Sequence, residues 1–250
     1  MASLFAQVSE YDRGVVLIQK GQPTAAVPLL ILATEAHPAQ ARAWVALGVA
    51  YAAQGMYDLA EPPFAHACDL DPKLHEACYY QGRSLYALGR FEASIQVLQR
   101  ADRFHPNSWK IRLGIAQALE GLGRAAEAEK EFRGTLLLGQ TSDPQPGVAL
   151  GLFLVRQGRS GEAIGLLDQV LLAFPSSAEA HLQLGRALLE QEKIAQALPH
   201  LEQAAKAQPA SAQAHTLLAK AYVRSGRLAE AQPHFEAAAK LEEAGKRTGH

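Results

Sequence analysis

Glycine recurs at a nearly constant interval along the 250 residues of this chain. The positions in this column are Gly21, Gly55, Gly89, Gly123, Gly158, Glu192 and Gly226. Successive members are 34 residues apart, except for one interval of 35 residues. A fixed period of this length is typical of arrays in which each repeat is a pair of packed helices. The chain is therefore expected to be a helical repeat array.

Other columns keep register with the glycine. Very small residues stand seven positions before it and five positions after it, which predicts two helices that approach closely. The earlier column is Gly14, Gly48, Gly82, Ala116, Gly151, Gly185 and Ala219, and the later one is Ala26, Ala60, Ser94, Ala128, Ala163, Ala197 and Ala231. A large apolar residue follows nine positions after the glycine: Leu30, Phe64, Leu98, Phe132, Leu167, Leu201 and Phe235. This column is expected to fill the space between helices.

Each unit reads as helix, glycine turn, helix and proline stop. The stop is a proline seventeen residues after the glycine at Pro38, Pro72, Pro106, Pro175 and Pro209. Proline ends a helix because its ring clashes with the preceding turn and it has no N–H to donate. The turn glycine suits a positive φ, which makes Glu192 the weakest turn. Further prolines seven residues after the turn, such as Pro28, are expected in the first turn of each second helix, where no bond is lost.

This pattern resembles the tetratricopeptide repeat family over nearly the whole chain. The clearest unit carries the family signature at Trp44, Leu47, Gly48, Tyr51, Gly55, Tyr57, Ala60, Phe64, Ala67 and Pro72. The resemblance implies an all-α fold, a right-handed α-solenoid of about seven helix-turn-helix repeats. The repeats are expected at 7–40, 41–74, 75–108, 109–142, 144–177, 178–211 and 212–245, as one domain over 1–250. A hinge or a change of pitch is expected in the stretch 139–147, which holds the inserted residue.

Composition excludes several classes of function. A formal net charge of −1 gives no long-range attraction to a polyanion, so nucleic acid binding is not expected. The sequence shows neither a signal peptide nor an apolar run long enough for membrane insertion. Cys68 and Cys78 are interpreted as buried thiols in a reducing compartment. The chain is accordingly expected to be cytoplasmic.

Nothing in the sequence indicates catalysis, a metal or a cofactor. The dipeptide His75-Glu76 lacks the second histidine of a zinc-protease helix, because Tyr79 occupies that position. His181 and His215 share one repeat slot, and a second pair one period apart follows at His200 and His234. Repetition of a structural position explains these histidines better than a metal site does, because two histidines alone are too few ligands. We therefore expect no enzyme and no cofactor.

The resemblance also implies a binding face. In that family the first helices line a concave surface, onto which positions ten, six and three before the turn glycine point. The residues in these positions are Tyr11, Val15, Ile18, Val45, Val49, Ala52, Tyr79, Arg83, Tyr86, Leu113, Gln117, Glu120, Val148, Leu152, Val155, Leu182, Arg186, Leu189, Thr216, Lys220 and Val223. The alternative for each aliphatic member is that it packs between neighbouring first helices.

Two groups on this face favour ligand binding. Tyr79, Arg83 and Tyr86 combine aromatic area with a guanidinium, the chemistry enriched at binding hot spots. Arg186, Lys220 and Arg224 form a cationic set that suits acidic groups next to an apolar body. The alternative is that these cations pair with Glu190 and other carboxylates on adjacent turns.

Two functions remain open. The first is a non-catalytic scaffold that binds a protein or peptide partner, of unknown identity, in its concave groove. The carboxylate clamp that some relatives use on chaperone tails is missing, because Asn107 is the only asparagine and lies in an inter-repeat loop. The second is a homo-oligomer formed through solenoid ends, because Phe235 and Leu241 in the last helix are expected to lack a cover.

Overall fold

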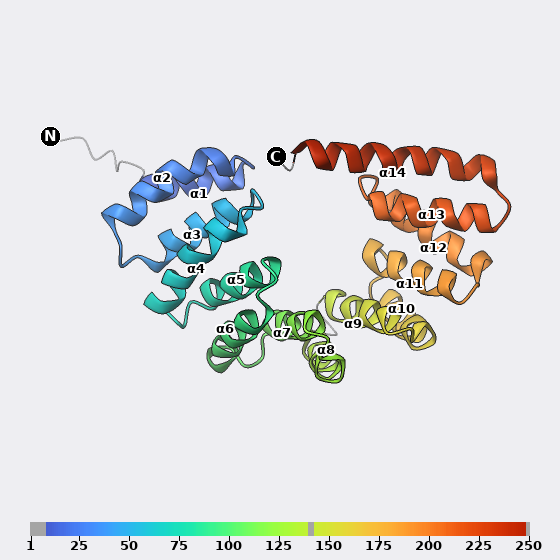
Figure 1. The fold of residues 1–250 in the computed structure, drawn as a ribbon, viewed down its shortest axis with the longest axis horizontal. Coiled ribbons are helices and arrows are strands. Elements are labelled where there is room, and N and C mark those ends of the chain that lie inside the picture. Colours follow the sequence, from blue (N-terminus) through green and yellow to red (C-terminus); the bar gives the residue numbers. More distant parts are fainter. Residues whose placement is uncertain (1–8, 140–142, 249–250) are drawn as a thin grey trace. The chain divides into compact units, whose positions relative to one another are not determined.

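A computed structural model describes residues 9–139 and 143–248 of the chain (Figure 1). In these residues the secondary structure consists of fourteen helices and includes no strand. The fold is therefore an all-α helical repeat solenoid, which confirms the expected fold class.

Two consecutive helices begin within each expected repeat, and only α14 extends past the expected end, at residue 245. The pairs are α1 (Glu10–Gln19) and α2 (Pro23–Ala36), α3 (Ala41–Ala52) and α4 (Tyr57–Leu70), α5 (His75–Ala87) and α6 (Phe91–Phe104), α7 (Trp109–Gly121) and α8 (Ala125–Gly139), α9 (Gln145–Arg156) and α10 (Ser160–Ala173), α11 (Ala178–Glu190) and α12 (Ile194–Ala207), and α13 (Ala212–Arg224) and α14 (Leu228–Thr248).

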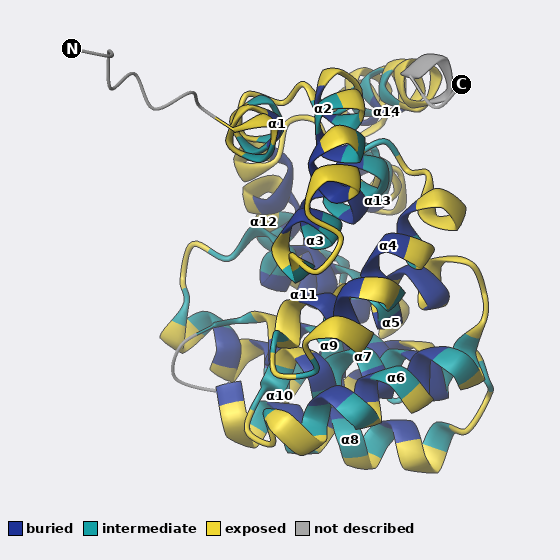
Figure 2. Ribbon diagram, turned by 90° about the vertical axis from the view of Figure 1, so that its left-hand side faces the viewer, coloured by how far each residue is buried: buried dark blue, intermediate teal, exposed yellow. Residues whose placement is uncertain are grey.

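The chain divides into two compact units, Met1–Glu131 and Phe132–His250. Consecutive helices pack on each other from α1 to α7 and from α9 to α14, and first helices in each unit also contact the first helix of the next repeat. Figure 2 shows the buried residues in dark blue along helices such as α3, α4 and α5. That all repeats behave as one domain stays a prediction. So does the hinge in 139–147, of which residues 140–142 lie outside the described part.

The turns take the conformation that the glycine column predicts. The six glycines of the column have φ between 71° and 79°, and Glu192 has φ of 58°. Glu192 is the only residue other than glycine with a positive φ among those described. The turn also satisfies the end of the first helix, because Gln22 N–H donates to the Leu17 carbonyl at 2.9 Å and Gly21 N–H to that of Ile18.

The small columns allow the close helix approach that we expected. A Cβ atom added to Gly48 would lie 2.6 Å from Cε1 of Phe64, which is 1% exposed. The same contact recurs between Gly14 and Leu30 and between Gly185 and Leu201. The glycine of the first helix thus receives the large side chain of the second. Phe235 is the exception in its column: it lies in α14, the last of the described helices, and is 40% exposed.

The expectation for the second-helix prolines is wrong. Helix α2 begins at Pro23, only two residues after the turn, so that Pro28 is its sixth residue and lies inside the helix. Pro199 in α12 and Pro233 in α14 lie inside their helices in the same way. The glycine turn is compact, and no loop separates it from the second helix. A proline seven residues after the turn glycine therefore lies beyond the first turn of that helix. Each proline therefore costs its helix one backbone hydrogen bond.

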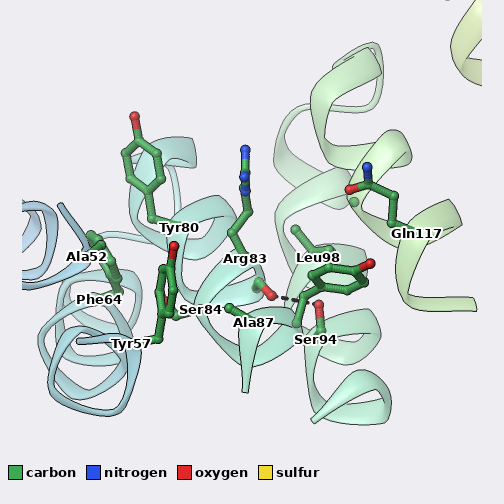
Figure 3. Close-up of a pocket in the computed structure, with 13 residues that line it drawn as sticks. Ala52, Tyr57, Phe64, Tyr80, Arg83, Ser84, Ala87, Ser94, Leu98 and Gln117 are labelled. Carbon is green, nitrogen blue, oxygen red and sulfur yellow. Dashed lines mark hydrogen bonds between the residues drawn. The ribbon is translucent and has the colours of Figure 1, made fainter. Parts of the chain in front are cut away.

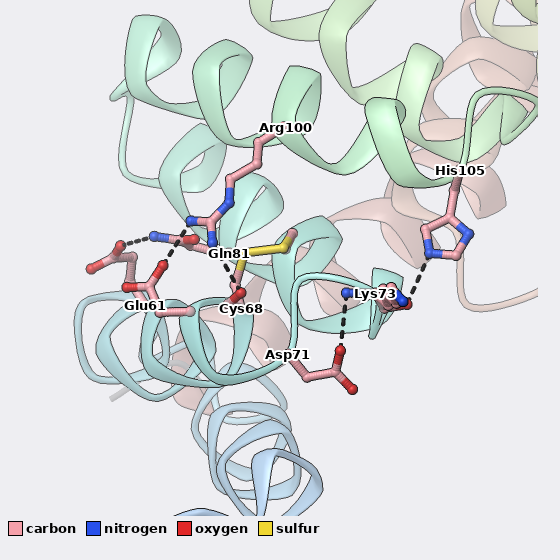
Figure 4. The surroundings of a disulfide bond; sticks show 9 residues. Glu61, Cys68, Asp71, Lys73, Gln81, Arg100 and His105 are labelled. Atoms are coloured by element: carbon pink, nitrogen blue, oxygen red, sulfur yellow. Dashed lines mark hydrogen bonds and ion pairs between the residues drawn. A yellow bond between two sulfur atoms is a disulfide. The ribbon is translucent and has the colours of Figure 1, made fainter.

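The interpretation of the two cysteines as free thiols is also wrong. Cys68 near the end of α4 and Cys78 in α5 form a disulfide, and both residues are fully buried (Figure 4). The turn around Pro72 brings the two Cα atoms to 4.9 Å, which is inside the range that a disulfide requires. Arg100 covers the pair by donating to the Cys68 carbonyl at 3.2 Å and to Asp69 at 2.7 Å. Disulfides are typical of oxidising compartments, so the cytoplasmic location loses one of its arguments and stays a prediction.

Candidate functional site

Among the residues predicted for the binding face and its cationic set, the following twelve are at least partly exposed: Tyr11, Val45, Val49, Tyr79, Arg83, Tyr86, Gln117, Glu120, Leu152, Arg186, Lys220 and Arg224. They do not form one site. The structure brings eight of them together in three separate hollows, two in the first unit and one in the second.

The binding-face prediction is wrong for the aliphatic positions of α9 and α11. Val148, Val155, Leu182 and Leu189 are between 1% and 5% exposed, although the family pattern predicted them on the open face. Here the packing alternative holds, because first helices α9 and α11 contact each other directly. The sequence pattern places a residue on a side of its helix, but the neighbouring helix decides whether that side is covered.

The first hollow, which we call the α5 hollow, has a volume of about 450 Å³. It brings together the predicted residues Arg83, Tyr86 and Gln117 with two tyrosines that the prediction missed, Tyr57 and Tyr80. Figure 3 shows Tyr57 and Tyr80 on one side of Arg83 and Gln117 on the other. Buried Phe64 and Leu98 form the apolar floor. The hollow therefore offers aromatic walls around a single cation.

Arg83 is held by an aromatic neighbour. Its Nη1 donates to the Tyr79 hydroxyl at 3.3 Å, and its guanidinium carbon lies 5.9 Å from the centre of the Tyr79 ring. This hydrogen bond is the main cause that raises the pKa of Arg83, so the charge is permanent. Among the described residues no carboxylate pairs with Arg83. A partially desolvated cation of this kind can accept an acidic group from a ligand.

The polar groups of the α5 hollow include hydroxyls beside the guanidinium of Arg83. The Ser94 hydroxyl is buried and donates to the Gly82 carbonyl at 2.7 Å, so its proton is already engaged. Burial is the main cause that raises the pKa of Tyr80, which keeps its phenol neutral. The site can therefore offer neutral hydroxyls and a guanidinium for binding. Sequence reasoning missed Tyr80 because it does not occupy one of the three periodic positions used to predict the binding face, although it directly follows Tyr79 in α5.

The second hollow, which we call the α13 hollow, lies in the second unit and has a volume of about 420 Å³. It brings together all three members of the predicted cationic set, Arg186, Lys220 and Arg224. The apolar lining includes Val223 of the same face and Phe235, which the binding-face prediction did not include. Phe235 belongs to the second-helix column, whose other members are buried.

The third hollow, with a volume of about 500 Å³, is lined by residues of the first three repeats. It places the predicted residues Tyr11 and Val45 beside Arg42, His75 and Glu76. Its charged side chains have mixed signs, so it offers no clear preference for one ligand charge. Val49, Tyr79, Glu120 and Leu152 are exposed to some extent but do not line any of these three hollows.

The repeated histidines form two hydrogen-bonded pairs. The Nδ1 atoms of His181 and His200 lie 2.9 Å apart, as do those of His215 and His234. The described residues contain no group of three side chains suited to hold a metal ion. Each pair joins a first helix to its own second helix. Separately, none of the described helices is long and apolar enough to cross a membrane.

Paired helices, positive-φ turns and side-chain hollows on first helices define a helical repeat protein of the solenoid class. The family model for the tetratricopeptide repeat matches residues 11–75, 77–145, 148–193 and 182–246. The chain therefore belongs to the tetratricopeptide repeat family. Repeats of this family generally serve as scaffolds for protein interaction.

Two of the most similar solved structures cover almost the whole chain. A tetratricopeptide repeat protein from Parabacteroides merdae is 16% identical, with a TM-score of 0.74 over 96% of this chain and 95% of that one. A chain of the APC/C hetero-tetramer Cut9-Hcn1 is 20% identical, with a TM-score of 0.72 over 95% of this chain and 46% of that one. At these identities the likeness shows the fold alone.

Among curated proteins, the human protein O-mannosyl-transferase TMTC1 is 34% identical to this chain over 88 residues. The match covers 35% of this chain but only 10% of the transferase. The chain thus spans about a tenth of that relative and less than half of the APC/C chain.

Proposed function

We propose that this protein is a non-catalytic scaffold that binds an extended peptide or a helix of a partner protein along the exposed face of its first helices. The α5 hollow is the observation that carries the proposal. Its residues come from helices α3 to α7, so a ligand seated there would contact several repeats at once. No cofactor is needed for this role.

The chemistry of the α5 hollow supports an anchored side chain. Tyrosine and arginine are enriched among residues that dominate binding energy, and Tyr86 and Arg83 are both exposed in the free protein. Arg83 keeps a charge without a carboxylate partner among the described residues. A partner segment with an apolar or aromatic side chain beside an acidic group would satisfy both features.

The test compares two double variants in affinity capture from a native lysate, followed by mass spectrometry. Arg83→Glu with Tyr86→Ala reverses the charge of the hollow and removes an aromatic wall. The control, Arg103→Glu with Phe104→Ala, makes the same charge reversal and also removes an aromatic ring, at two exposed residues of α6 outside the hollow. We expect wild type and control to retain the same partner and the α5 variant to lose it. Equal capture by all three proteins would contradict the proposal.

A second candidate function is self-association through the last helix. Leu228 and Phe235 of α14 are 66% and 40% exposed, and terminal repeats of solenoids normally need a polar outer surface. Sedimentation of wild type beside Leu228→Glu, over a range of concentrations, tests this alternative. A dimer in the wild type that dissociates in the Leu228→Glu variant would support self-association. A wild type that is monomeric at high concentration would contradict it.

A further inference from the structure

We infer that the α13 hollow binds an acidic segment of a partner protein, in which side-chain carboxylates stand next to a large apolar side chain. This inference rests on the proposed function, because it names the chemistry of a partner at a second position on the same scaffold. The two hollows belong to different units, so each is argued and tested by itself.

The first argument is the charge of the lining. Three cations, Arg186, Lys220 and Arg224, share the hollow with one carboxylate, Glu190. Like charges gathered in a small space repel one another, and a bound anion relieves that repulsion. The hollow therefore favours a negatively charged ligand, although the chain as a whole has a net charge of only −1.

The second argument is that the local carboxylates are already engaged. Glu190 accepts a hydrogen bond from the Ser160 hydroxyl at 2.6 Å and lies 3.7 Å from Nε of Arg186. Arg224 donates to the Leu189 carbonyl at 2.8 Å, while its ion pair with Glu192 is 3.7 Å long and highly exposed. Lys220 has no hydrogen-bond or ion-pair partner among the described residues. Ion pairing with nearby carboxylates thus engages Arg186 and Arg224 in part. It does not engage Lys220.

The hydrogen bonds also fix the geometry of the hollow. Leu189 and Glu190 end α11, whereas Arg224 ends α13, so the bond from Arg224 ties two successive first helices together. Arg186 forms only an ion pair of 3.7 Å with Glu190 on its own helix. The guanidinium group of Arg224 is therefore oriented before a ligand arrives, which lowers the entropy cost of binding.

The third argument is the apolar side of the hollow. Val223 and Phe235 are 42% and 40% exposed, and Leu217 completes this side. Burying such side chains against a ligand is favourable in proportion to the apolar area removed from water. A free inorganic anion would leave this area uncovered. A carboxylate beside an aliphatic or aromatic side chain would use both sides of the hollow.

A nucleic acid fits the hollow less well. Glu190 and Glu192 flank the cations, so a dense row of phosphates would meet two carboxylates together with three positive charges. Separate carboxylates on a peptide can occupy the cations and avoid the acidic edge. We therefore infer that the ligand is an acidic peptide. Competition by inorganic phosphate tests whether the hollow binds phosphate instead.

The probe is a short peptide with an amidated C-terminus and an uncharged fluorophore, in which Leu-Phe is flanked by Asp and Glu. A second peptide replaces Asp and Glu with Asn and Gln, and a third replaces Leu-Phe with Ser-Ser. Binding to the full chain is followed by fluorescence anisotropy, with inorganic phosphate as a competitor. We expect the first peptide to bind at least about tenfold more tightly than either of the others.

The variants locate the binding site. Lys220→Glu with Arg224→Glu should weaken binding of the first peptide by about tenfold or more, and Val223→Ser should weaken it by a smaller factor. The matched control, Lys206→Glu with Lys240→Glu, makes the same change in net charge at two exposed lysines outside the hollow. It should leave the affinity unchanged. Circular dichroism confirms that each variant is folded.

Three results would overturn the inference. The first peptide does not bind, or the control variant loses as much affinity as the Lys220→Glu, Arg224→Glu variant. The third is that inorganic phosphate displaces the peptide at concentrations at which phosphate alone binds the protein. These results leave the proposed function intact if lysate capture still depends on Arg83 and Tyr86. If that capture fails while the peptide binds at Lys220, the scaffold proposal for the α5 hollow is wrong and the α13 hollow stands alone.

Discussion

The Nδ1 atoms of His215 in α13 and His234 in α14 lie 2.9 Å apart, and Nε2 of His215 lies 3.0 Å from the Pro209 carbonyl. A carbonyl can only accept, so Nε2 of His215 carries a proton. In the neutral ring Nδ1 of His215 must then accept a hydrogen bond from Nδ1 of His234. Trp44, in the same repeat slot, donates from Nε1 to the Pro38 carbonyl at 2.8 Å in the same way.

From the two histidine pairs we predict that the protein becomes less stable in mild acid. Desolvation is the main cause that lowers the pKa of His200 and of His234, and the partner histidine lowers it further. Asp168 near His200 and Glu202 near His234 act in the opposite direction but do not reverse the shift. Below the ordinary histidine pKa of 6.5, the unfolded chain therefore binds more protons than the folded chain. The free energy of unfolding should fall as the pH drops through this value.

Urea unfolding between about pH 7.5 and about pH 5.5 measures this slope. The double variant His200→Gln, His234→Gln removes the two depressed groups and should show a shallower slope over the same range. A slope of the opposite sign in the wild type would show that the pairs gain protons on folding.

Gly48→Ala should destabilise the second repeat. The new Cβ would meet Cε1 of buried Phe64 at 2.6 Å, so the ring or the helix must shift. Overpacking of this kind costs about 1–3 kcal/mol. Thermal or urea unfolding followed by circular dichroism measures the loss.

The matched control for that variant is Gly165→Ala. Gly165 lies in the middle of α10, is exposed, and has nothing within 4 Å of a new Cβ. Alanine there should stabilise the protein by about 0.5–1 kcal/mol, because it restricts the unfolded chain and favours the helix. If both alanine variants changed stability in the same direction, packing against Phe64 would not be the cause.

Glu192→Gly should stabilise the sixth repeat. Glu192 holds a positive φ of 58°, which is costly for a residue with a Cβ. Its ion pair with Arg224 is 3.7 Å long, with the glutamate side chain 87% exposed, and contributes little. The expected net gain is about 0.5–1 kcal/mol, after the greater freedom of glycine in the unfolded chain is included. Chemical unfolding gives the difference, and a loss of stability would mean that the ion pair outweighs the backbone.

Reduction should destabilise the protein through the bond between Cys68 and Cys78. The two residues are 10 positions apart, and release of a loop of that length costs about 2–3 kcal/mol in the chain-entropy account. Melting with and without dithiothreitol measures the effect. The double variant Cys68→Ala, Cys78→Ala should melt below the oxidised wild type and should not respond to the reductant. A wild type that is equally insensitive would show that the bond does not form in solution.

The sequence alone was sufficient for the local architecture. The turn at Gly55, the stop at Pro72 and the contact between Gly48 and Phe64 all follow from residues within one repeat. Each such feature depends on a backbone conformation or a side-chain size that a single position dictates. This is why the helix pairs and the positive φ values could be predicted without tertiary information.

The candidate site was predictable only in part. The period predicted Arg83, Tyr86 and Lys220 on the binding face, and the structure leaves all three exposed, while their role in binding stays a prediction. It failed for Val148 and Leu182, which the neighbouring first helix covers. Exposure depends on how closely two repeats approach, and that distance is set by many side chains together.

Only the tertiary structure decided which residues meet. The sequence determined that this chain is a succession of helix pairs, because a repeated local pattern specifies each pair. It did not determine that Cys68 and Cys78 would bond, that Tyr80 would join Arg83 in one hollow, or that Phe235 would stand beside Lys220. These contacts join different helices, and the angle at which one helix packs on the next sets the distances between them.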